Sequence, residues 1–143
     1  IPIRVSKVDY STIARAIAMR KTNGFFKIIV SDDEDMKVLG MRAIGEHASS
    51  AIQSVSLLMY MNKGIDELAH MIHPHPSIVE GVQECVRMLI GKSVYKSSIF
   101  KDKLKCYKRT VDGEILPLHT ITENPEENLN REKMRELNRT NFH

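Results

Sequence analysis

Residues 73–80, HPHPSIVE, place two histidines, two prolines and a carboxylate in one short stretch. Histidine exchanges protons near neutral pH, and a carboxylate on one ring nitrogen fixes its tautomer and stabilises the imidazolium ion. His75 lies between the two prolines, and Glu80 lies one turn into the helical pattern that follows. These two side chains are therefore candidates for an acid/base pair that takes a proton from a thiol.

The same residues also fit a purely structural role. Ser77 and Glu80 have the spacing of a capping box, in which the Ser77 hydroxyl accepts the Glu80 backbone N–H and the Glu80 side chain returns to the cap residue. His73 and His75 would then be partly exposed loop residues. The two interpretations are compatible, because Glu80 could cap the helix and hold His75 in place at the same time.

A metal site is a third alternative, since His70, His73 and His75 lie close together in the sequence. A structural zinc site needs further ligands, and the only cysteines, Cys85 and Cys106, lie on or beyond the next helical segment. The prolines also hold the loop against easy adjustment. We therefore expect no metal at this stretch.

The length of 143 residues fits a single domain with a hydrophobic core. The composition, 42% hydrophobic and 27% charged, is that of a globular domain, and no apolar run is long enough to cross a membrane. The sequence starts inside a predicted strand without Met or a signal pattern, so we expect a fragment of a longer polypeptide. Two widely separated cysteines argue against a disulfide framework and favour the reducing cytoplasm.

Three strands are predicted before the histidine stretch. Apolar and polar residues alternate over 3–8, FFKIIV at 25–30 follows an Asn-Gly turn, and residues 36–45 return after the acidic turn SDDED. These segments predict an antiparallel meander.

Helical periodicity then replaces the strand pattern. The first helix runs from Ala48 to near Gly64, the second covers 65–72 and ends at the prolines, and the third covers 77–91. The histidine stretch is thus a loop between two helices. The first helix should cover the sheet with one apolar face, made of Ala48, Ala51, Ile52, Val55, Leu58 and Met59.

The residues after Gly91 differ in character. Asp112-Gly113 predicts a hairpin over 103–121, and residues 126–138 predict a last helix with a thin apolar stripe. A cluster of cations, with the single acid Asp102 among them, suggests binding to nucleic acid or to an acidic surface. A solvated strand face whose lysines protect a sheet edge explains the cluster better. The cluster consists of Lys92, Lys96, Lys101, Lys103, Lys105, Lys108 and Arg109.

The histidine stretch also resembles a family signature. His75-Pro76-Ser77 followed by Glu80 resembles the His-Pro-Thr/Ser-x-x-Glu segment of the flavin-dependent pyridine nucleotide-disulfide oxidoreductases, and His73 makes it most similar to the dihydrolipoamide dehydrogenase branch. Further similarities follow in one order from residue 4 to 91. They are RAIA at 15–18, GFFK at 24–27, VLG at 38–40, IG at 44–45, Ala48, Ile52, Gln53 and DELA at 66–69.

The resemblance implies a C-terminal interface domain with an α+β fold, in which helices cover an antiparallel sheet and two subunits form a homodimer. It implies that His75 is the acid/base for a dithiol substrate and that Glu80 orients it. His75 and Pro76 would lie near the flavin of the partner subunit, and the bond between them would be cis. The full-length cytoplasmic enzyme would use FAD and NAD(P).

The chain also departs from this family. It has no GxGxxG segment and no CxxxxC redox pair, so we expect those parts upstream of Ile1 and no activity from this fragment alone. The family's opening strand and helix are missing too, which predicts an exposed sheet edge. We therefore divide the chain into an interface domain at 1–91 and a hairpin-plus-helix extension at 92–143. The alternative function is a non-catalytic dimerisation or protein-association module.

Overall fold

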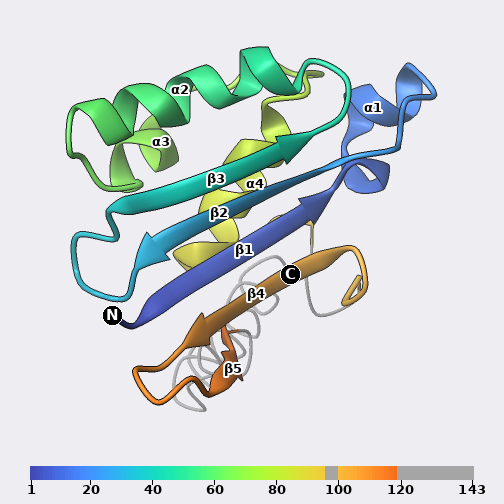
Figure 1. Ribbon diagram of the computed structural model, residues 1–143. Coiled ribbons are helices and arrows are strands. Elements are labelled where there is room, and N and C mark those ends of the chain that lie inside the picture. The colour runs from blue at the N-terminus through green and yellow to red at the C-terminus, as the bar shows by residue number, and fades with distance from the viewer. Residues whose placement is uncertain (96–99, 119–143) are drawn as a thin grey trace, which may run out of the picture.

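The computed structural model describes residues 1–95 and 100–118, which form one five-stranded antiparallel sheet with helices (Figure 1). The strands are β1 (Ile3–Asp9), β2 (Phe25–Ser31), β3 (Val38–Ile44), β4 (Leu104–Arg109) and β5 (Ile115–Pro117). Their order in the sheet is β3-β2-β1-β4-β5. The predicted α+β fold and the predicted meander of the first three strands are confirmed.

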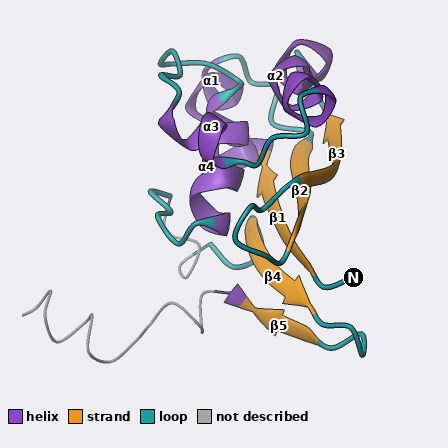
Figure 2. Ribbon diagram, turned by 90° about the vertical axis from the view of Figure 1, so that its left-hand side faces the viewer, coloured by secondary structure: helices purple, strands orange, loops and turns teal. Residues whose placement is uncertain are grey.

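One face of the sheet forms the core. Figure 2 shows the helices gathered on one side of the strands. Alternate residues of β2, namely Phe26, Ile28 and Val30, point to that side and are fully buried. This is the period-2 pattern of a strand that is covered on one face and open on the other.

The helices are α1 (Ala14–Ala18), α2 (Ala48–Tyr60), α3 (Asp66–His70) and α4 (Glu80–Leu89). Helix α4 packs against β1 and β2, and α2 packs against β3. The last three helices correspond to the predicted ones with shorter ends. The sequence interpretation missed α1 and the 3-10 turn at Tyr10–Thr12 before it, in which the Asp9 carboxylate accepts the Ser11 N–H at 2.9 Å.

The predicted apolar face of α2 is only partly correct. Ala51, Val55 and Leu58 are buried as expected, whereas Met59 is 44% exposed. Successive residues of a helix are separated by about 100°, so Met59 lies about 100° around the helix from Leu58, at the margin of the buried stripe. Helix α2 therefore contacts the sheet along a narrower stripe than the apolar pattern suggested.

Strand β4 lies beside β1 in the sheet. It pairs with β1 from Val8 opposite Leu104 to Ile3 opposite Arg109. Strand β1 therefore lies inside the sheet, between β2 and β4, and the edge strands are β3 and β5. The β4–β5 hairpin was predicted, but the predicted helix at 126–138 lies outside the described residues.

Within the described parts of the chain, no helix is long and apolar enough to cross a membrane.

Candidate active site

The histidine loop connects α3 to α4 at the surface. Pro74, His75 and Pro76 are exposed, and the peptide bond between His75 and Pro76 is cis, as expected. Ile78 is only 6% exposed and belongs to the hydrophobic core. The loop is therefore anchored by its apolar end while its histidine remains accessible.

His75 and Glu80 form the predicted side-chain pair. The Nδ1 atom of His75 lies 2.6 Å from Oε1 of Glu80. The histidine side chain is 72% exposed and the glutamate side chain is 12% exposed. A carboxylate can only accept, so Nδ1 carries the proton and donates it to this hydrogen bond. In the neutral imidazole, Nε2 is then left with the lone pair of a base.

The expected capping box is half formed. The second carboxylate oxygen of Glu80 accepts the Ser77 backbone N–H at 3.4 Å, which is the expected return contact. The Ser77 hydroxyl instead donates to the Pro74 carbonyl at 2.5 Å, and α4 begins only at Glu80 without a side-chain cap. The prediction for the hydroxyl is therefore wrong, because Val79 and not Ser77 is the residue that precedes the first turn of α4. Ser77 instead closes the loop that carries His75.

Gly81 is a positioning residue that the sequence interpretation missed. A Cβ atom there would lie 2.5 Å from Cδ1 of Ile13 and 2.7 Å from Cδ2 of Phe26. These distances are shorter than van der Waals contact, so only glycine lets α4 approach the sheet this closely. Because Glu80 is the neighbouring residue, this approach also sets where its carboxylate lies. A glycine after the first helical residue was the only sequence signal, and it does not reveal which atoms crowd it.

The other two histidines of this region have separate partners. His70 donates from Nδ1 to the Asp66 carbonyl at 2.8 Å, and His73 donates from Nδ1 to the Met71 carbonyl at 3.1 Å. Nowhere in residues 1–95 and 100–118 do three or more His, Cys, Asp or Glu side chains group as a metal site would require. Of these three histidines, His75 is the one whose hydrogen-bond partner is a carboxylate, that of Glu80.

Both cysteines of the chain are free thiols inside the fold. Burial raises the pKa of Cys85 to about 12 and the pKa of Cys106 to about 12. A thiol is nucleophilic as its thiolate, so neither side chain is suited to dithiol–disulfide exchange at neutral pH. The chain itself thus offers His75 no accessible thiol.

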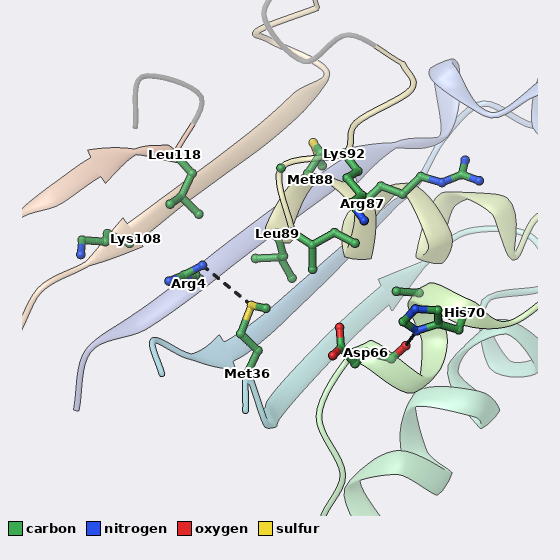
Figure 3. Close-up of a pocket in the computed structure, with 13 residues that line it drawn as sticks. Arg4, Met36, Asp66, His70, Arg87, Met88, Leu89, Lys92, Lys108 and Leu118 are labelled. Carbon is green, nitrogen blue, oxygen red and sulfur yellow. Dashed lines mark hydrogen bonds between the residues drawn. The ribbon is translucent and has the colours of Figure 1, made fainter. Parts of the chain in front are cut away.

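A separate cavity of about 550 Å³ lies between the sheet and α3 (Figure 3). Arg4 and Lys108 line it from neighbouring strands, and Asp66 and His70 line it from α3. The cavity does not include His75, which the sequence and the geometry mark as the acid/base candidate. This cavity is therefore separate from the candidate active site.

Two of the cations that line this cavity, Arg4 and Lys108, share one carboxylate. Asp32 accepts from Nε of Arg4 at 2.5 Å and from Nζ of Lys108 at 3.2 Å. The Arg4 hydrogen bond, with help from Lys108, holds the pKa of Asp32 below its usual value against the opposing effect of burial. This ion cluster joins β1, β4 and the turn after β2. It was not predicted, because Asp32 was assigned to an exposed acidic turn.

Glu84 is a buried carboxylate that also escaped prediction. It lies on α4, is fully buried, and accepts hydrogen bonds from the Ser93 hydroxyl, from the Val94 N–H at 3.3 Å and from the Tyr95 N–H at 3.2 Å. These contacts fasten the segment after α4 to the helix. Their role is structural, because Glu84 has no exposed surface among the described residues.

The comparisons with known proteins identify the family of the domain that carries this loop. Residues 1–86 match the family described as "Pyridine nucleotide-disulphide oxidoreductase, dimerisation domain". Similar curated proteins include a dihydrolipoyl dehydrogenase of Staphylococcus aureus, 30% identical over 66% of this chain and 20% of that protein. The dihydrolipoyl dehydrogenase of Chlamydia muridarum is 35% identical over 56% of this chain and 17% of that protein.

A solved structure shares the fold. LpdA from Mycobacterium tuberculosis superposes with a TM-score of 0.56 at 24% identity, over 60% of this chain and 18% of that protein. The chain spans about one fifth of the curated relatives that it matches, for example 19% of the Bacillus subtilis dihydrolipoyl dehydrogenase at 28% identity over 65% of this chain.

Proposed function

Since this chain belongs to the pyridine nucleotide-disulphide oxidoreductase family, whose dimerisation domain it contains, we propose that it serves a homodimeric enzyme resembling dihydrolipoamide dehydrogenase. In this proposal His75 and Glu80 are the acid/base pair that the domain contributes to the active site of the partner subunit. The observation that carries the proposal is the 2.6 Å hydrogen bond between an exposed imidazole and a largely buried carboxylate.

The proposed chemistry is a proton transfer at Nε2 of His75. This atom accepts a proton as a substrate thiol becomes a thiolate, and Nδ1 keeps its hydrogen bond to Glu80. The imidazolium ion that results is stabilised by the Glu80 carboxylate, which the Ser77 N–H holds in place. Histidine suits this step because its charge changes near neutral pH.

The dithiol substrate comes from outside this chain in the proposed enzyme. His75 projects from the surface, and the two cysteines are buried with raised pKa values. A residue that faces outward without a thiol in its own domain is suited to act on a neighbouring subunit. This arrangement would make the dimer, rather than the single chain, the catalytic unit.

FAD and NAD(P) are assigned to other parts of the full-length enzyme. All five strands of the described residues are antiparallel, and the sequence has no GxGxxG segment. The parallel βαβ unit that binds such dinucleotides therefore does not fit these residues. In the proposal the flavin of the partner subunit lies near His75 and Pro76, the enzyme works in the cytoplasm, and this chain alone is inactive.

An apolar patch on α2 supports the dimer. Leu57 is 56% exposed, Tyr60 is 89% exposed and Met61, just after the helix, is 53% exposed. These residues lie at i, i+3 and i+4 and so share one side of the helix. An exposed apolar patch of this kind is typical of an interface, and we assign it to contact with the partner subunit.

The test is the His75→Gln variant of the full-length enzyme. Glutamine keeps a polar side chain but cannot take the proton, so dithiol oxidation should fall by about 10²–10⁴-fold. Dimerisation and bound flavin should stay as in the parent. The matched control is His73→Gln in the same loop, which should retain near-parental turnover. Near-parental turnover of His75→Gln would contradict the proposed role.

A further inference from the structure

Four cationic side chains form a row across the sheet face that carries no helix. The register places Lys7 opposite both Lys27 and Lys105, and it places Lys27 opposite Arg42. Directly paired residues of an antiparallel sheet lie on the same face. The cation row, Arg42-Lys27-Lys7-Lys105, therefore crosses β3, β2, β1 and β4 on the face opposite α4, which is the open near side in Figure 1.

This row opposes the stability of the sheet. Neighbouring strands lie about 4.8 Å apart, and like charges directly opposite each other are destabilising. None of the four side chains forms an ion pair within residues 1–95 and 100–118; Lys7 instead places Nζ 4.3 Å from the centre of the Phe25 ring. Asp9, two residues along β1 from Lys7, is engaged with Ser11. Among the described residues, no ion pair therefore relieves the repulsion.

Ordinary surface roles do not account for the row. A surface built for solubility intersperses charges of both signs, whereas this row holds one sign only. Lysines that protect a sheet edge lie on edge strands, but Lys7 and Lys27 lie on the interior strands β1 and β2. Edge protection stays a prediction for Lys105, because among the described residues β5 pairs with β4 only from Tyr107 to Arg109.

The strand pattern also divides the Lys-rich segment between two faces. Lys105 lies in the cation row, whereas Lys108 lies on the opposite face and pairs with Asp32. The local basicity is therefore not one continuous cationic surface. What the fold creates instead is a row of cations that come from four different strands.

We propose that the cation row is a docking surface for an acidic segment of a partner protein. Apolar side chains lie beside the row, half-buried Ile29 on one side and Ile44, which is 53% exposed, on the other. Cations with apolar neighbours match an amphipathic protein segment, which offers carboxylates and apolar side chains together. The row spans about 14 Å, the length over which one face of a helix or strand presents two or three carboxylates.

Nucleic acid fits this face less well. Proteins that bind single strands on a sheet stack the bases on free aromatic rings. The Phe25 ring beside the row is already covered by the Lys7 ammonium group. A phosphate backbone would also make no favourable apolar contact with the aliphatic side chains beside the row. The surface therefore favours carboxylates on a protein over phosphates.

The experiment is a fluorescence anisotropy titration of a labelled glutamate-rich peptide with the full chain, at low and high salt. Binding should weaken steeply as salt rises. The double variant Lys27→Gln with Lys105→Gln should bind about tenfold more weakly, because it removes two of the four charges. The matched control, Lys101→Gln with Lys103→Gln, removes the same charge from exposed residues outside the row and should bind as the parent does.

Thermal melting separates lost binding from lost folding. Because the row is repulsive, the Lys27→Gln and Lys105→Gln changes should leave the melting temperature unchanged or raise it. Three results would each overturn the proposal: peptide binding that salt does not weaken, an equal loss in the control variant, or tighter binding of single-stranded DNA of equal charge.

Discussion

At the scale of residues, the His75–Glu80 pair depends on the charge of the glutamate. In the full-length enzyme, Glu80→Gln keeps a hydrogen-bond acceptor for Nδ1 but loses the negative charge that stabilises the imidazolium ion. A charge-assisted hydrogen bond exceeds a neutral one by about 1.4 kcal/mol, so dithiol oxidation should fall about tenfold. The rate and the bound flavin are measured together. Glu67→Gln on the exposed side of α3 is the control; equal rates for both variants would remove Glu80 from the mechanism.

Three buried acids predict how stability depends on alkaline pH. Burial, with a smaller effect of Glu46, raises the pKa of Tyr10 to about 12, and burial raises the pKa values of Cys85 and Cys106 to about 12. The folded chain therefore keeps protons that the unfolded chain releases from about pH 9 upward. The contribution of these three groups to stability should be constant below about pH 9 and should be lost as the pH rises toward 12.

Urea unfolding at a series of pH values checks this prediction. Tyr10→Phe should flatten the loss above about pH 10, because it removes one of the three groups. At neutral pH the same variant should cost about 0.5–1.5 kcal/mol, since the Tyr10 hydroxyl donates to the Glu46 carbonyl at 2.9 Å. An alkaline profile identical to that of the parent would refute the assignment.

At the scale of elements, β4 completes the sheet beside β1. Leu104 is 2% exposed and lies opposite Val8, so Leu104→Ala should lower the free energy of unfolding by about 2–5 kcal/mol. The control is Val111→Ala in the hairpin turn, where the parent side chain is 75% exposed and the change should stay within about 0.5 kcal/mol. Equal effects in a urea titration would mean that β4 does not pack as described.

How well sequence predicted each element depends on how local its cause is. The first three strands were predicted because alternation and turn residues act within a few positions. The position of β4 was not, because its register with β1 joins residues about one hundred positions apart and leaves no local pattern. Likewise, the spacing of His75 and Glu80 predicted their contact, whereas the role of Gly81 depends on Ile13 and Phe26 from distant segments.

At the scale of the whole molecule, the patch of Leu57, Tyr60 and Met61 is assigned to the dimer interface. Leu57→Glu and Tyr60→Glu place charges in an apolar contact, so the full-length enzyme should shift from dimer to monomer in analytical ultracentrifugation. Ala14→Glu adds the same charge at the exposed start of α1 and should leave the dimer intact. A dimer that survives both interface substitutions would place the contact elsewhere.

The central claim, that His75 acts in the active site of the partner subunit, is tested most directly by subunit mixing. One parent enzyme carries His75→Gln, and the other has its redox cysteines replaced; both are inactive in the proposed mechanism. In the mixed dimer, one active site combines intact cysteines from the first subunit with an intact His75 from the second. Dithiol oxidation should therefore appear on mixing. Mixed dimers that form and remain inactive would contradict the claim.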